Sequence, residues 1–339
     1  MTSAEIVARG FEPVAQALGD KRIPGAVLGV VDQSGARAVH HEGAAQIEPT
    51  RVAMMRETIF DLASLTKVIF TTTTILRLAE QGRVGLDQQL SELIPDLRQY
   101  DLTAPERRLT IRQCLTHQTF LPAVEPLYTY NDDPQGLRAF VLQRVWKHGP
   151  PVYSDINFIL LGIAIERITG KPLLEQKLDR GFTFRPDPKG CAATERCTWR
   201  GRVMRGEVHD ENAYALGGAS GHAGLFGHID AVLDFAASLL NGSALAPASL
   251  ALLRKREAPQ RTIGWEMKYE KWSGGALCSE DSIGHTGFTG VGLWIDFQRG
   301  LAWSLLTNRV HPTRHFDSGI IPLRREVADR VVAAFDETR

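Results

Sequence analysis

Ser64 and Lys67 stand three residues apart in the segment 60–67, where an extended stretch runs into a helix. Positions i and i+3 share one face of a helix, so the lysine amine can reach the serine hydroxyl. A serine at the first turn also has its own backbone N–H among the unpaired donors that favour an oxyanion. If burial and a nearby cation lower the pKa of Lys67, the pair provides a nucleophile and its base. The alternative is a serine that caps the helix, followed by an exposed lysine.

A second candidate is the tripeptide Tyr153-Ser154-Asp155, which follows two prolines at positions 150 and 151. The prolines favour an extended entry, and a helix is predicted to begin at about Asn157. Tyr153 is therefore expected at the end of a loop, where its phenol could point into a cleft. The alternatives are that Tyr153 only packs and that Asp155 caps the following helix.

A third candidate is His285-Thr286-Gly287, which lies in a segment of small residues, 283–290. Small residues allow the backbone of a ligand to lie beside the edge of a strand. Glycine-rich turns before a hairpin are common, so this segment has little meaning by itself.

The three segments, in this order and spacing, resemble the signature of the serine β-lactamase and penicillin-binding protein superfamily, specifically its class C-like branch. That signature is S-x-x-K, then Y-x-N or a variant, then K-T-G or H-T-G. Flanking segments at 23–26, 115–117, 221–226 and 286–290 are similar to the family as well. The resemblance covers about residues 20 to 310. It implies an α+β, β-lactamase/transpeptidase-like fold, with an antiparallel sheet flanked by helices and an inserted, mainly helical subdomain.

The resemblance also implies a role for each matching residue. Ser64 would attack an acyl carbonyl, while Lys67 and Tyr153 would share the task of taking and returning its proton. His285 would occupy the position of the cation in the third motif and orient the tyrosine or a substrate carboxylate. The backbone N–H groups of Ser64 and Phe288 would form the oxyanion hole. Water would then hydrolyse the covalent acyl-enzyme.

The substrate-binding positions implied by the resemblance are Asp155, His285, Thr286 and Gly287, and two of them depart from the common pattern. Asp155 replaces an asparagine, and a carboxylate accepts hydrogen bonds but does not donate them. An amine or hydroxyl donor on the substrate fits this position better than a penicillin-type acylamino group, so slow β-lactam hydrolysis is expected. His285 replaces a lysine and weakens the anchor for a carboxylate at neutral pH.

The periodicity of apolar residues predicts the elements that position these residues. An amphipathic helix opens the chain, and the runs 26–31 with 36–40 and 290–297 with 301–307 predict two hairpins. Further helices are predicted at 64–80, 109–117, 137–146, 157–169 and 229–240, and a last one carries Leu323, Val327, Val331 and Ala334. We therefore expect a sheet subdomain from residues 1–60 plus 255–339 and a mainly helical subdomain from 61–254, forming one catalytic unit.

A long irregular segment, 177–227, is expected to be functional or packed over a site. Its Arg200, His209, Asp210 and Asn212 either line the substrate side of the cleft or form a polar network that pins the loop. This stretch is similar to family members associated with the turnover of cell-wall muropeptides. It has no recognised metal-ligand spacing, so no metal site is predicted. His222 is expected to be structural, and Trp265, Trp272, Trp294 and Trp303 are expected in the core.

Composition limits the class of partner. The 339 residues include 39 basic and 39 acidic side chains, which argues against nucleic acid or an anionic membrane as a partner. The four cysteines match no zinc or disulfide pattern, so free thiols are expected. The N-terminal segment lacks the apolar core of a signal peptide, and the chain has no apolar stretch of membrane-spanning length, so we expect a cytoplasmic protein.

The sequence predicts a serine hydrolase that forms an acyl-enzyme at Ser64 and acts on small amides or esters without a cofactor. Peptides derived from the cell wall are the favoured substrates. The alternatives are a promiscuous carboxylesterase and a penicillin-binding sensor that is acylated without turnover. The partner is a small-molecule or peptide substrate, and nothing in the sequence predicts an oligomeric state.

Overall fold

A seven-stranded antiparallel sheet forms the centre of the fold in the computed structural model, which describes residues 2–131 and 133–337. The strand order is β3-β2-β1-β12-β11-β10-β9, so the two ends of the chain meet where β1 pairs with β12. The strands are β1 (Gly25–Asp32), β2 (Arg37–Gln46), β3 (Val52–Ala53), β9 (Glu266–Met267), β10 (Ile283–Thr286), β11 (Gly292–Asp296) and β12 (Leu301–Thr307). The antiparallel sheet and both predicted hairpins are confirmed.

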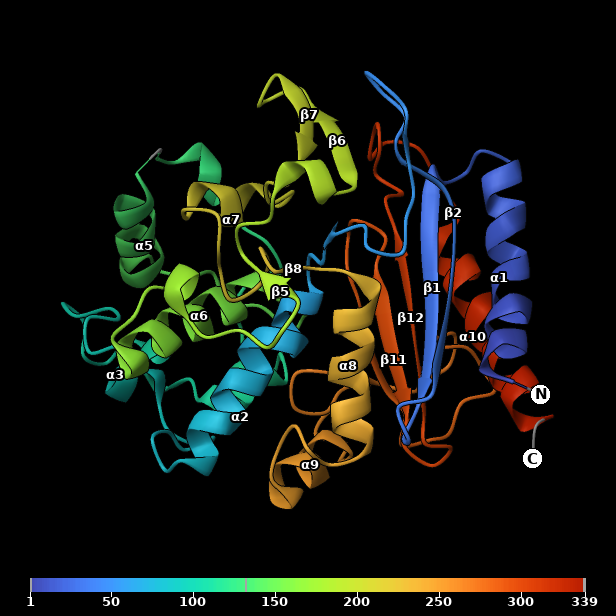
Figure 1. Cartoon of the computed structure of the whole chain (residues 1–339). Helices are drawn as coiled ribbons and strands as arrows, with labels where there is room; N and C mark the ends of the chain where they lie inside the picture. Colours follow the sequence, from blue (N-terminus) through green and yellow to red (C-terminus); the bar gives the residue numbers. More distant parts are fainter. Residues whose placement is uncertain (1, 132, 338–339) are drawn as a thin grey trace.

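Helices cover both faces of this sheet (Figure 1). Helices α1 (Ser3–Gly19) and α10 (Ile320–Asp336) pack together on one face, and α8 (Ile229–Leu240) packs on the other against β1 and β12. Strand β12 is buried at every position, and β1 at all but its last. A strand covered on both faces must be apolar throughout, which explains the continuous apolar runs of these two segments.

The remaining helices lie beside the sheet, with α9 at the lower end of α8 (Figure 1). They are α2 (Thr73–Glu80), α3 (Leu90–Leu93), α4 (Ile111–Leu115), α5 (Pro134–Gln143), α6 (Asp155–Thr169), α7 (Glu211–Ala215) and α9 (Pro247–Leu253). Helix α8 lies in the 61–254 range by sequence but packs on the sheet. The division into two subdomains at those residues stays a prediction.

The segment 177–227 is less irregular than expected. It contains a hairpin of β6 (Ala193–Cys197) and β7 (Arg202–Arg205), which projects at the top of the molecule in Figure 1. It also supplies β5 (Phe182–Thr183) and β8 (Phe226–Gly227), which join β4 (Phe60–Asp61) in a small sheet. These strands are too short to show a clear alternation of apolar and polar residues.

Several helix ends differ from the predicted ones for local reasons. Helix α4 is shorter than 109–117 because Thr110 caps its start and His117 adopts a positive φ of 55°. Helix α5 begins early, at Pro134, because Asp133 accepts a hydrogen bond from Gly136 N–H as its cap. The predicted helix 64–80 includes a π-helical stretch, Lys67–Thr72, before α2. A π-helical stretch often occurs at a functional site.

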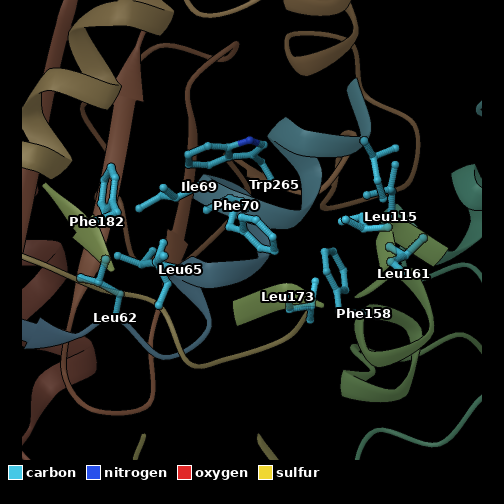
Figure 2. Close-up of a cluster of buried hydrophobic side chains, with 14 of the residues drawn as sticks. Leu62, Leu65, Ile69, Phe70, Leu115, Phe158, Leu161, Leu173, Phe182 and Trp265 are labelled. Atoms are coloured by element: carbon cyan, nitrogen blue, oxygen red, sulfur yellow. The ribbon is translucent and has the colours of Figure 1, made fainter. Parts of the chain in front are cut away.

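Buried apolar side chains fasten the segment after β4 to the helical part. Leu62, Leu65, Ile69 and Phe70 lie with Phe158 and Leu161 of α6 in one cluster, which Figure 2 shows. All four of Trp265, Trp272, Trp294 and Trp303 are buried, as predicted. The four cysteines are free and buried. Among the described residues, no helix has the length and hydropathy needed to cross a membrane.

Candidate active site

Ser64 sits in a tight turn between β4 and the π-helical stretch. The preceding residue, Ala63, has a left-handed φ of 45°, which is costly for a residue with a Cβ. The buried carboxylate of Asp61 supports this turn, because it accepts hydrogen bonds from the N–H of Ala63 at 2.8 Å and of His209 at 2.6 Å. Strain of this kind persists where surrounding contacts over-determine it, often at active sites.

Lys67 is fully buried, and its amine contacts several groups. Nζ donates to Ser64 Oγ at 3.0 Å and to the carbonyl oxygen of His222 at 3.1 Å. It also lies 2.8 Å from Asp155 Oδ1, as an ion pair. Asp155 is the first residue of α6, but Ser154 is the cap position and no side-chain cap is formed there. The carboxylate of Asp155 is therefore used for Lys67 instead of the helix end.

These partners determine the protonation of Lys67. Burial lowers the pKa of its amine, but the Asp155 carboxylate and the Tyr153 hydroxyl raise it more, so the pKa lies above its ordinary value. The expectation of a lowered pKa is therefore wrong for the free enzyme, because the charged partner of the buried amine is an anion. The resting Lys67 is an ammonium that holds the hydroxyl of Ser64.

Tyr153 completes what we call the Ser64 cluster: Ser64, Lys67, Tyr153 and Asp155. The centre of its ring lies 4.9 Å from Lys67 Nζ, and its hydroxyl interacts with both Lys67 and Ser64. Burial raises the pKa of Tyr153 against the opposing effect of Lys67. The structure thus brings together the hydroxyl, the amine and the phenol that the sequence singled out.

Two side chains that the sequence analysis did not assign to the site lie against Tyr153. The ring of His117 lies 4.6 Å from the Tyr153 ring, centre to centre, and its Nδ1 accepts a hydrogen bond from Ser154 N–H. The guanidinium of Arg261 lies 5.1 Å from the Tyr153 ring centre. His117 stands in a segment that matches the family, which was the available signal, whereas Arg261 had none.

His285, on β10, is buried next to these groups. Burial and the positive charges of Arg261 and Lys67 hold the pKa of His285 well below its ordinary range. Its Nδ1 lies 3.0 Å from the carbonyl oxygen of Thr286. The imidazole is therefore neutral at pH 7, so His285 carries no charge with which to bind a carboxylate. Its ring lies 5.9 Å from that of Tyr153, centre to centre, which suits a role in orienting the tyrosine.

The turn after β10 lies against the turn of Ser64. A Cβ added at Gly287 would come within 2.9 Å of the Leu62 carbonyl oxygen, so only glycine allows this approach. Arg324 of α10 donates to the carbonyls of Gly287 and Val291 from behind. Within residues 2–131 and 133–337, no hydrogen bond occupies the backbone N–H of Ser64 or of Phe288. Both are free to donate to an oxyanion, and Thr286 follows His285 along the same strand edge.

An Asp210–His222 pair adjoins the cluster. His222 Nε2 lies 2.8 Å from Asp210 Oδ1. Burial raises the pKa of Asp210, but His222 and neighbouring groups lower it by more, so the pKa lies below its ordinary value. Ligand atoms of Asp155, Asp210 and His222 lie within 4.8 Å of one another, a set that could hold a metal ion. The Lys67 ammonium beside Asp155 already supplies positive charge there and would repel a divalent cation.

The other polar residues singled out in the 177–227 segment hold the loop. Arg200 donates to the carbonyls of Val208 and His209, and Asn212 donates to that of Glu125. The contacts therefore support the simpler of the two interpretations, a polar network that pins the loop. Arg314 joins it by donating to carboxylates of the segment, and no sequence signal marked this residue.

Comparisons with known proteins show the family and the fold of the chain. The family model described as Beta-lactamase matches residues 11–325. The N-acetylmuramyl-L-alanine amidase of Bacillus subtilis is 32% identical over 313 residues, covering 76% of this chain and 69% of that protein. Among solved structures, a class C beta lactamase has a TM-score of 0.75 at 16% identity, covering 98% of this chain and 99% of that one. Unliganded simvastatin synthase from Aspergillus terreus has a TM-score of 0.75 at 22% identity, covering 98% and 100%. The structural similarities show the fold alone.

Proposed function

This chain belongs to the Beta-lactamase family and is a serine hydrolase, and we propose that it cleaves the amide bond of cell-wall-derived muramyl peptides. The observation that carries the proposal is the Ser64 cluster, in which a buried lysine amine lies 3.0 Å from the serine hydroxyl. The 32% identity with a muramyl-L-alanine amidase supports the choice of substrate.

The proposed reaction begins with attack of Ser64 Oγ on the amide carbonyl. Lys67 and Tyr153 titrate as one coupled pair, and the reactive form of the enzyme is the one in which this pair has lost one proton. In that form the pair accepts the proton of Ser64 Oγ. The N–H groups of Ser64 and Phe288 hold the oxyanion of the tetrahedral intermediate. The pair then returns the proton to the leaving nitrogen, the C–N bond breaks, and an ester at Ser64 remains.

Deacylation repeats these steps with water. The Lys67–Tyr153 pair accepts a proton as the water oxygen attacks the ester carbonyl, and the ester bond to Ser64 breaks. Ser64 takes up a proton and the free acid leaves. In this scheme Asp155 keeps the charge of Lys67 balanced, and Thr286 and Gly287 provide the strand edge along which the substrate backbone lies.

Slow β-lactam hydrolysis is part of the proposal. Asp155 cannot donate a hydrogen bond to the acylamino carbonyl of a penicillin, and its carboxylate is already engaged by Lys67. The neutral His285 offers no charge to the carboxylate of a β-lactam.

The cytoplasmic location expected from the sequence also stays a prediction.

The test uses purified protein with N-acetylmuramyl-L-alanyl-D-isoglutamine, and mass spectrometry follows the products. We expect free N-acetylmuramic acid and L-alanyl-D-isoglutamine, with no products from Ser64→Ala. Turnover of p-nitrophenyl esters without turnover of this amide would favour the carboxylesterase. A stable adduct with a penicillin or fluorophosphonate, without turnover of either substrate, would favour the sensor.

A further inference from the structure

Three aromatic side chains gather on the surface formed by the β6–β7 turn, α7 and the 3₁₀ turn Leu127–Thr129. Trp199 and Tyr214 are 49% and 38% exposed, and Tyr128 is partly buried. The ring centres of Tyr128 and Trp199 lie 4.9 Å apart, and those of Trp199 and Tyr214 lie 5.8 Å apart, edge to face. We call these three residues the aromatic rim.

The aromatic rim is held in place from below. The side chain of Arg200 is 2% exposed, and its guanidinium lies 4.0 Å from the ring centre of Tyr214 and 5.4 Å from that of Trp199. Its hydrogen bonds to the Val208 and His209 carbonyls fix the guanidinium. Three rings that lie side by side and remain partly open to water form an exposed apolar patch, and such patches often mark ligand-binding surfaces.

The rim is joined to the Ser64 cluster by one short helix. Asp210 caps α7, and its carboxylate lies in the group with Asp155 and His222 beside Lys67. Tyr214 follows four residues later, which is roughly 6 Å along a helix axis. Figure 1 shows α7 next to the β6–β7 hairpin, on the same side of the molecule as β8 and the start of the α2 segment.

We propose that the aromatic rim is a saccharide subsite that binds the sugar on the acyl side of the scissile amide. The C–H face of a pyranose ring suits the negative face of an aromatic ring. Polar groups lie beside the rings. Arg202 interacts with Tyr214 and pairs with Glu207 at 2.8 Å. Arg202 can donate hydrogen bonds to sugar hydroxyls, and Glu207 can accept them. In a muramyl group, one ether oxygen and one carbon separate the sugar ring from the reacting carbonyl. This inference rests on the proposed function.

The kinetic test compares two amides that differ only in the sugar: N-acetylmuramyl-L-alanine and O-methyl-D-lactyl-L-alanine. We expect the wild type to prefer the first, and Trp199→Ala to reduce this preference in kcat/KM by roughly three- to tenfold. Trp199→Phe should restore most of it. The matched control is Tyr100→Ala, which removes a fully exposed ring elsewhere, 92% exposed, and should keep the wild-type ratio. A wild-type ratio of one, or an unchanged ratio in Trp199→Ala, overturns the proposal.

A binding test separates this proposal from the function on which it rests. Saturation-transfer NMR with free N-acetylmuramic acid needs no catalysis and can use Ser64→Ala as the host. We expect transfer to the sugar ring protons in this host and its loss when Trp199→Ala is added, with the circular dichroism spectrum unchanged. If the amide is not hydrolysed but this signal appears, the proposed function fails and the subsite stands. If the signal is absent from the host, the subsite fails.

Discussion

Replacing Asp155 with asparagine removes the negative charge that keeps Lys67 protonated. The two charges lie 2.8 Å apart and the amine is fully buried, so water can replace the lost partner only in part, from the side of position 155. Burial, which lowers the pKa of Lys67, is then opposed by Tyr153 and by the charge of Asp210. The pKa of Tyr153 should also fall, since Asp155 raises it.

The size of the change follows from the geometry. At an effective dielectric constant of about 20, two unit charges at 2.8 Å attract by about 6 kcal/mol, an upper limit of about 4 pKa units. The amide dipole of asparagine and water at the partly exposed position 155 replace part of this attraction. We therefore expect the pKa of the Lys67–Tyr153 pair to fall by about 1–3 units.

The assay is the pH dependence of kcat/KM for a p-nitrophenyl ester. The pair acts as a base after losing a proton, so a lower pKa moves the rising limb of the profile to lower pH by the same 1–3 units. The matched control is Asp179→Asn, which removes a carboxylate paired with Arg77 on the surface, and its profile should match the wild type. The reasoning is refuted if the rising limb of the pH profile of Asp155→Asn stays at the wild-type position or moves to higher pH.

The same substitution predicts a change in stability with a defined sign. In the wild type the pKa of Lys67 is raised on folding, so this group stabilises the protein below its unfolded pKa, and the effect is lost as pH rises through the folded pKa. In Asp155→Asn the carboxylate no longer offsets burial, so we expect the folded pKa to fall below the unfolded one. The charged amine then disfavours folding at neutral pH, by about 3–5 kcal/mol at most, and the deficit should shrink as pH rises, as denaturant unfolding can measure.

Three further predictions concern the reacting groups and the turn beside them. Ser64→Ala should abolish turnover and labelling by a fluorophosphonate while the unfolding midpoint stays near that of the wild type; residual turnover near the wild-type rate would remove Ser64 from its role. Tyr153→Phe should lower the acylation rate by roughly 10²–10⁴-fold in pre-steady-state assays, whereas a normal rate would mean that the ring only packs. Gly287→Ala should lower kcat because a Cβ there meets Val291 Cγ2 at 2.5 Å. Gly19→Ala, where a Cβ has nothing within 4 Å, should leave kcat unchanged. Equal activity of these two variants would show that the turn at Gly287 need not lie close to the turn of Ser64.

Local patterns were sufficient for much of the fold. The predicted helix 229–240 coincides with α8. A turn precedes its first residue, and the apolar periodicity continues to its last. The strands of the central sheet were predicted from apolar runs since burial on two faces demands them. The short strands β5 and β8 were missed, since two residues are too few to show a period of two.

Longer-range features of the site had no local signal. Asp61 contacts His209 N–H across 148 positions of sequence, and Lys67 contacts the carbonyl of His222 across 155. Neither contact leaves a pattern in the neighbouring residues. Arg261, which lies over the Tyr153 ring, likewise stands in an unremarkable surface-like stretch.

The sequence by itself determined which groups could react, because a serine and a lysine three residues apart at the start of a helix lie close together by local geometry. It also determined the family, through three motifs in a fixed order. Only the tertiary structure decided the charge of the lysine, because Asp155 reaches it from another helix and the pKa of a buried amine depends on the sign of whatever lies beside it. The neutral state of His285 was decided in the same way, by burial next to Arg261 and Lys67, which other segments of the chain supply.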